Sequence, residues 1–200
     1  MQQRTRLDAE SILAATEEIL RRHGPAKATV VDVARALGVS HAAVYKHFAS
    51  KQALREAVTR RWLDQNRDAL AAVAADAAVP PVRRLRAWLH AVLELKQAKV
   101  RDDPELFAAY GILAAAHSGV ATGHVADLRS QLTGILAAGA DDGTFRIDDL
   151  DATARAVFTA TAKFNHRAHA AEWEAPGIGA ELDAVCDLLL DGLRGRQSED

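Results

Sequence analysis

The sequence has a single cysteine, Cys186, and few aromatic residues. One cysteine cannot form a disulfide within the chain, which predicts a protein of a reducing compartment such as the cytoplasm. Aromatic residues make up only 5% of the 200 residues, whereas hydrophobic residues make up 49%. Small and aliphatic side chains must therefore fill the core, and this favours close packing of helix on helix over a sheet.

Long apolar segments and catalytic signatures are also missing. No apolar run is long enough to span a bilayer, and the first residues lead into an amphipathic helix instead of a signal peptide. The chain has no glycine-rich phosphate loop after a strand, no paired-cysteine motif and no nucleophile elbow. We therefore expect no membrane partner, no cofactor and no enzymatic activity.

The formal net charge of only -2 conceals an uneven distribution along the chain. Residues 1–67 hold 12 lysines and arginines against 7 acids, whereas residues 68–200 hold 13 against 20. A basic first third joined to an acidic remainder indicates a nucleic-acid-binding module attached to a second module.

The segment from Thr29 to Lys51 has the pattern of two short helices joined by a tight turn. Thr29 can cap a first helix, and its apolar positions recur at helical spacing. Gly38 can take the left-handed conformation that ends this helix, and Ser40 can cap the next one. Two helices joined through such a turn are the signature of a helix-turn-helix.

The outer face of the second helix has the residues that a major-groove contact needs. Val44 and Phe48 should pack on the first helix, so that His41, Tyr45 and Lys46 point outward. The alternative is a helical hairpin packed into a larger bundle, with these residues on an ordinary surface. The predicted DNA-binding residues are Thr29, Ser40, His41, Ala42, Ala43, Tyr45, Lys46, His47 and Lys51.

These residues resemble the DNA-binding region of the tetracycline-repressor (TetR) family of bacterial regulators. The matching pieces are TVVDVA from Thr29, LGVS from Leu37, VYKHF from Val44 and SKQAL from Ser50. The resemblance covers roughly the first third of the chain, and the remainder matches only in layout. It implies a homodimer, an all-helical C-terminal domain that senses a small molecule, and repression that is relieved by ligand.

The periodicity predicts an all-α protein of about nine helices. The helix-turn-helix domain is expected over residues 1–52, completed by the start of a long helix from Lys51 to about Arg67. Residues 68–200 are expected to form the ligand-sensing and dimerisation domain. The predicted helices cover about 8–23, the two of the helix-turn-helix, 51 to as far as 78, 82–100, a helix from Pro104, and 124–140, 148–172 and 180–193.

Two apolar stripes of the second domain are candidates for a dimer surface. They lie on the helices over 148–172 and 180–193, and pairing with symmetry mates would form a four-helix interface. The alternative is that both stripes belong to the core of one chain. The predicted interface residues are Val157, Ala162, Leu182, Val185, Leu189 and Leu193.

A ligand pocket between helices of the second domain is expected to have apolar walls and a few polar groups. The candidate residues are Trp88, Phe107, Tyr110, His117, His124, Phe158, Thr161 and His166. His166 and His169 are spaced to share a metal ion, but ordinary hydrogen bonding by both histidines is the favoured interpretation, so that no metal site is predicted.

The leading hypothesis is a dimeric transcriptional regulator that binds a double-stranded DNA operator and answers to a small-molecule effector. Two other classes compete with it: a small helical enzyme with a coincidental helix-turn-helix-like segment, and a helical scaffold that binds only protein. Sequence-selective, salt-sensitive binding to duplex DNA separates the first class from the other two.

Overall fold

The computed structural model describes residues 7–116 and 118–194, with the side chains of Lys27 and Ser118 left out. Within these ranges the regular secondary structure is helical and no strand occurs, as the sequence predicts. It divides into two units: unit 1 consists of Met1–Gln65 and Asp103–His124, and unit 2 of Asn66–Asp102 and Val125–Asp200. Within the described ranges, no single helix is both long and apolar enough to cross a membrane.

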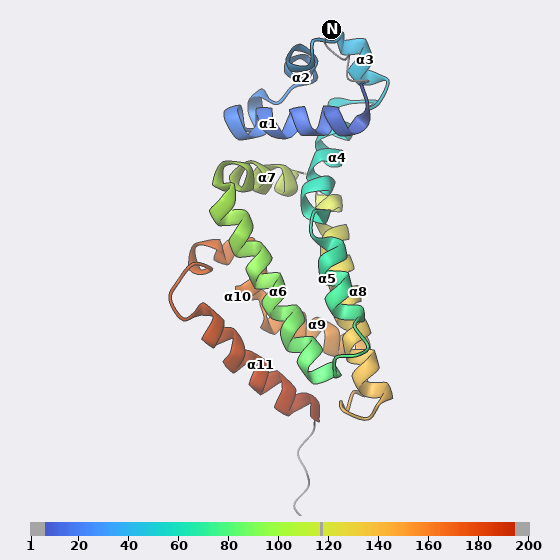
Figure 1. The fold of residues 1–200 in the computed structure, drawn as a ribbon, viewed down its shortest axis with the longest axis vertical. Helices are drawn as coiled ribbons and strands as arrows, with labels where there is room; N and C mark the ends of the chain where they lie inside the picture. The colour runs from blue at the N-terminus through green and yellow to red at the C-terminus, as the bar shows by residue number, and fades with distance from the viewer. Residues whose placement is uncertain (1–6, 117, 195–200) are drawn as a thin grey trace, which may run out of the picture. The chain divides into compact units, whose positions relative to one another are not determined.

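Unit 1 contains the predicted helix-turn-helix and one helix from later in the chain. Its helices are α1 (Ala9–Lys27), α2 (Val30–Leu37), α3 (His41–Tyr45), α4 (Lys51–Asp64), α7 (Pro104–Ala116) and the first residues of α8 (Ser118–Asp141). In Figure 1, α2 lies on one side of α1 and α7 on the other, and both helices contact α1. Residues 103–124 therefore pack with the N-terminal helices, although the sequence analysis had assigned them to the second domain.

Local hydrogen bonds fix where the helices of unit 1 begin. Asp8 and Ser11 form a reciprocal capping box at the start of α1. The hydroxyls of Thr29, Ser40 and Ser50 accept hydrogen bonds from backbone amides three residues later and so cap α2, α3 and α4. The caps by Thr29 and Ser40 are the ones that the sequence analysis predicts.

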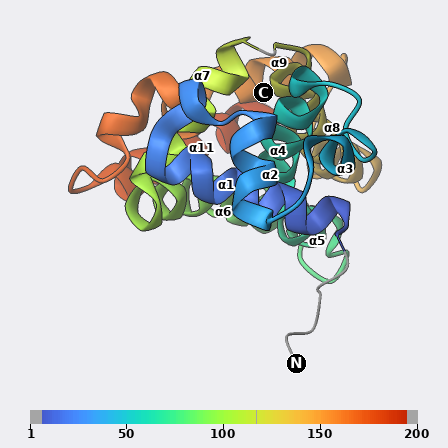
Figure 2. The same cartoon turned by 90° about the horizontal axis from the view of Figure 1, so that it is seen from above.

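Gly38 makes the turn between α2 and α3. It has the left-handed conformation with φ 65° and ψ 31°, and the amide of Val39 donates to the carbonyl of Ala34 at 2.9 Å. Val44 of α3 is fully buried, and Phe48 is partly buried, against the apolar core of this unit. Figure 2 shows α2 drawn over α1, with α3 beside it.

The core of unit 1 joins α7 to the N-terminal helices. Tyr110 is fully buried, and its ring stacks on Trp62 of α4 with the centroids 4.4 Å apart. Leu106, Ala109 and Leu113 of α7 lie in the same apolar cluster as Ile12 and Leu20 of α1. Helix α7 is thus a structural part of the unit that contains the helix-turn-helix.

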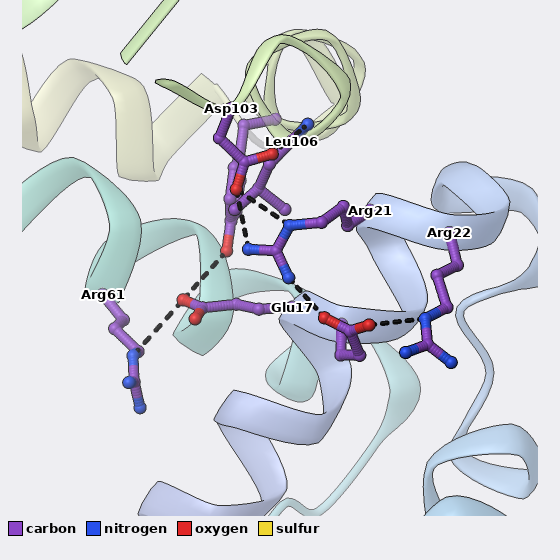
Figure 3. A network of polar contacts seen from close by, with 8 residues as sticks. Glu17, Arg21, Arg22, Arg61, Asp103 and Leu106 are labelled. Atoms are coloured by element: carbon purple, nitrogen blue, oxygen red, sulfur yellow. Dashed lines mark hydrogen bonds and ion pairs between the residues drawn. The ribbon is translucent and has the colours of Figure 1, made fainter. Parts of the chain in front are cut away.

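Polar contacts reinforce the same junction (Figure 3). Arg21 of α1 donates through Nε (2.9 Å) to the Asp103 carboxylate, which also caps α7 by accepting from the amide of Leu106. The Tyr110 hydroxyl donates to Glu17 at 3.3 Å, and Nε of Arg61 lies 3.3 Å from the same carboxylate. Burial raises the pKa of Glu17, although Arg61 acts in the opposite direction.

Unit 2 is built around α6, which contacts α5, α10, α11 and the 3-10 helix. Its elements are α5 (Arg67–Ala75), α6 (Pro81–Asp102), the remainder of α8, α9 (Leu150–Ala160), α10 (Ala162–Asn165), the 3-10 helix η1 (Arg167–Glu172) and α11 (Ile178–Arg194). Pro81 stands at the first position of α6, where its missing N–H is not needed.

Three boundaries differ from the predicted ones. The helix from Lys51 ends at Asp64, and the chain leaves helical geometry at Asn66 (φ -120°, ψ 17°), so α4 and α5 are separate helices. The predicted helix over 148–172 ends at Thr161, whose hydroxyl donates back to the carbonyls of Val157 and Phe158. In contrast, α8 continues through Gly119 and Gly123, where the sequence had indicated a break.

One close contact in unit 2 depends on a glycine. The ring of Phe145 packs on Gly139 of α8, and a Cβ atom at Gly139 would lie 2.0 Å from Cδ2 of that ring. Gly134 lies in the same helix and has no atom within 4 Å of its Cβ position.

These two glycines provide a matched pair of substitutions. Gly139→Ala should lower the free energy of unfolding by about 1–3 kcal/mol because the ring must move out of a packed position. Gly134→Ala should raise it by up to about 1 kcal/mol, because alanine favours the helix and meets no neighbour. Chemical denaturation of both variants tests this, and equal effects would contradict the described packing.

Glu17 predicts a pH dependence. Because its pKa is higher in the folded than in the unfolded chain, its contribution to stability is present below the unfolded pKa of about 4.3 and is lost as the pH rises. Glu17→Gln keeps a hydrogen-bond acceptor for Tyr110 but removes the charge. Arg61 keeps an ion-pair partner in this variant, because its Nη1 atom also lies 2.5 Å from Oε1 of Glu10. The Tm of the variant relative to the unmodified protein should therefore increase between about pH 4 and pH 7. A Tm difference that is the same at both pH values would refute this.

Candidate DNA-binding site

Helix α3 and the turn that follows it present a polar outer face. His41, Ala42, Lys46 and His47 are exposed, and Tyr45 has 47% of its surface exposed, although it is a large aromatic residue. Ala43 is partly buried on the same short helix. The structure therefore exposes, on one short segment, most of the residues that the sequence predicts for a contact with the major groove.

The start of α4 supplies a second cation near a set of backbone donors. Lys51 is the first residue of α4 and is exposed. The Ser50 hydroxyl accepts a hydrogen bond from the backbone amide of Ala53. In the part of the chain that the structure describes, neither Lys46 nor Lys51 forms an ion pair. Both ammonium groups are thus available to an anionic partner such as a DNA phosphate.

The hydroxyl of Thr29 is already engaged. It accepts from the amide of Asp32 and donates to the Asp32 carboxylate at 2.5 Å. This bond is the main reason why the pKa of Asp32 lies below its usual range. A phosphate contact by Thr29 would compete with this bond, so that Lys51 is the better candidate anchor.

A groove of about 780 Å³ lies beside Thr29, between α1 and α2. Its two arginines already have partners, because Arg22 pairs with Glu18 at 2.5 Å and Arg35 pairs with Asp32 at 3.2 Å. These ion pairs leave the groove without excess positive charge for DNA, in contrast to the α3 face.

Comparison with known proteins assigns the family. The sequence model of the tetracyclin repressor-like C-terminal domain matches residues 81–186, and that of the tetR family of bacterial regulatory proteins matches residues 12–58. The chain belongs to the TetR family. These matches agree with the helix-turn-helix geometry of unit 1 and with the helical content of the rest of the chain.

Individual relatives of this TetR-family chain are moderately similar to it. An uncharacterised HTH-type transcriptional regulator of Mycobacterium tuberculosis is 34% identical over 105 residues, which is 52% of this chain and 50% of the relative. The chain thus aligns with about half the length of this curated relative.

Solved structures show the same fold over most of both chains. A transcriptional regulator of Pseudomonas aeruginosa PAO1 has a TM-score of 0.71 at 20% identity, covering 95% of this chain and 93% of that one. FadR of Thermus thermophilus, solved in complex with lauroyl-CoA, has a TM-score of 0.63 at 22% identity, covering 96% and 98%.

The predicted pocket residues are divided between the two units. Phe107, Tyr110 and His124 belong to unit 1, where Tyr110 takes part in the core around Trp62. The others described belong to unit 2, and His117 lies outside the described residues. Among the four predicted pocket residues of unit 2, Trp88 and Thr161 are buried, Phe158 is partly buried and His166 is exposed.

The two histidines considered for a metal have other contacts. Nδ1 of His166 accepts from the amide of Ala168 at 3.3 Å, and Nδ1 of His169 lies 2.8 Å from Oε1 of Glu172. No group of three or more metal-ligating side chains occurs within residues 7–116 and 118–194. These contacts agree with the favoured interpretation as hydrogen-bonding histidines.

The predicted dimer stripes are divided between core and surface. Val157, Leu182 and Leu193 are buried within one chain, so these three side chains are core residues and not a free interface. Val185, Leu189 and Ala162 are partly buried. Leu188 of α11, which is 75% exposed, is not among the predicted interface residues, because helical spacing places it about 120° around the helix from Leu182 and so off the apolar stripe.

Lys46 and Lys51 should differ in what their removal does to DNA binding. Lys46→Ala should cost about 1–3 kcal/mol on the preferred sequence and relax specificity at one base pair, if its ammonium group reads a guanine edge. Lys51→Ala should weaken binding to all sequences alike and lower the salt slope by about one.

Titrations of both variants against operator variants at several salt concentrations measure the two effects. Arg60→Ala is the control, because Arg60 is an exposed cation farther along α4. Identical behaviour of Lys46→Ala and Lys51→Ala would contradict the division into reading and anchoring residues.

Proposed function

We propose that this TetR-family chain is a ligand-responsive DNA-binding transcriptional regulator. In this proposal it acts in the cytoplasm as a homodimeric repressor, and a small-molecule effector bound by unit 2 releases it from the operator. The observation that carries the proposal is the capped α2–α3 turn, with the exposed Tyr45 and Lys46 on its outer face. This function requires no catalytic group.

The relatives support the effector part of the proposal. The Thermus thermophilus FadR that shares this fold was solved in complex with lauroyl-CoA, so a protein of this fold can bind a small molecule. Ligand and DNA binding would then be coupled reciprocally, typically by about 1–3 kcal/mol.

The homodimer is supported by an apolar surface on α11. Leu188 has 75% of its surface exposed, and the partly buried Val185 and Leu189 lie next to it at helical spacing. A two-fold dimer would read a palindromic operator whose half-sites lie one helical turn, roughly 34–36 Å, apart.

The DNA function is tested by selecting fragments bound by the protein from the organism's own genome. We expect enrichment of a palindromic sequence, with binding that weakens steeply as salt increases. An enzyme or a protein-binding scaffold would give no sequence-selective, salt-sensitive binding, and that outcome would overturn the proposal.

The dimer is tested by placing a charge on the exposed part of α11. Leu188→Arg should give monomers by light scattering and a large loss of operator affinity, because the two half-sites are no longer held by one molecule. Ser130→Arg, which adds the same charge at an exposed position of α8, should remain dimeric. A monomeric unmodified protein would disprove the dimer.

A further inference from the structure

The segment that precedes α1 has the composition of a nucleic-acid contact. Residues 1–6 read MQQRTR, with two arginines, two glutamines and no acidic residue. Arginine and glutamine are among the side chains with which proteins read the minor groove of DNA, because their N–H groups donate to the acceptors on its floor. The DNA contacts assigned to α3 and to Lys51 make no use of this segment.

Two local devices fix the point at which this segment joins α1. Asp8 and Ser11 form the capping box at the start of the helix. Leu7, the residue before the cap, and Ile12, the fourth residue of the helix, belong to the same apolar cluster, which is the pattern of a hydrophobic staple. A staple sets the angle at which the chain enters a helix, so residues 1–6 start from a defined position in unit 1.

This starting position lies beside the outer face of the helix-turn-helix. In Figure 1 and in Figure 2 the dark-blue start of α1 is next to α3. Phe48, which follows α3, packs against the same apolar cluster as Leu7. Hydrogen bonds from Ser11 are the main reason why the pKa of Asp8 lies below its usual range, and the neighbouring His47 acts in the same direction. The segment therefore leaves unit 1 at the edge of the surface assigned to the major groove.

Six residues are long enough to leave that groove. An extended chain spans at most about 3.3–3.6 Å per residue, so residues 1–6 reach up to roughly 20 Å from Leu7. The major groove is only about 12 Å wide. With α3 in the major groove, the arginines can cross the sugar–phosphate backbone at its edge and enter the adjacent minor groove. Where A·T pairs narrow the minor groove its negative potential is enhanced, which favours an inserted arginine.

We propose that Arg4 and Arg6 bind the minor groove of A·T-rich DNA beside each half-site. This inference rests on the proposed function in taking α3 as the helix that lies in the major groove. It adds a second contact surface and a sequence preference at base pairs that α3 does not touch. The competing outcome is that the same arginines bind only phosphates, which would give no preference for sequence.

The test changes the minor groove and leaves the major groove as it is. Two duplexes contain the operator obtained by selection, with A·T pairs placed on both sides of each half-site. In the second duplex, 2,6-diaminopurine replaces the adenines of these flanks, which adds an amino group to the minor-groove edge as guanine does. The full chain should bind the second duplex about tenfold more weakly. Equal affinity for the two duplexes would overturn the proposal.

Two double variants separate this contact from general charge effects. Arg4→Ala with Arg6→Ala should lose about tenfold in affinity for the first duplex and should no longer discriminate between the two. Arg22→Ala with Arg60→Ala removes the same charge from exposed positions of α1 and α4 and should keep the full discrimination. Discrimination that persists without Arg4 and Arg6 would overturn the role of these arginines.

Failure of this inference can be distinguished from failure of the proposed function. A full chain that binds neither duplex with sequence selectivity would disprove the DNA function and this inference with it. Selective binding of equal strength to both duplexes would leave the DNA function intact and remove only the minor-groove contact. Arg4 and Arg6 precede the capping box in the sequence, so their substitution should leave the Tm unchanged. If the Tm fell, the two duplexes compared with the unmodified chain would still decide.

Discussion

The stack of Trp62 on Tyr110 is the contact on which unit 1 depends. It joins α4 to α7, and the hydroxyl of Tyr110 extends the junction to Glu17 of α1. Without α7, the apolar face of α1 that meets Leu106 and Leu113 would be exposed to water. The helix-turn-helix packs on that same α1, so the position of its outer face depends on a residue far along the chain.

The local structure of the helix-turn-helix could be predicted from the sequence, because its determinants are local. Thr29, Ser40 and Ser50 cap helices through bonds that span only three residues, and Gly38 needs no distant partner for its left-handed conformation. The exposure of Tyr45 and Lys46 follows from the burial of Val44, which helical spacing alone determines.

What could not be predicted depends on contacts between distant segments. Because Tyr110 is aromatic and lies in the C-terminal part of the chain, the sequence predicts it as a pocket residue. Its stacking on Trp62 depends on the packing of α7 against α4, which the sequence pattern does not reveal. Leu182 and Leu189 belong to one apolar stripe, yet only packing in three dimensions decides that the first is buried and the second partly exposed. No proline or glycine lies near Asn66, so the sequence contains no signal for the end of α4 there.

The chain passes between the two units three times, after Gln65, after Asp102 and after His124. The unit that contains the helix-turn-helix is therefore discontinuous in sequence. A fragment that ends with α4 would lack Tyr110 and the leucines beside it, and its apolar surface would favour aggregation. Exchange of DNA specificity between regulators of this type, in evolution or by gene fusion, thus cannot rely on an N-terminal cassette alone, because the graft must also include a compatible α7.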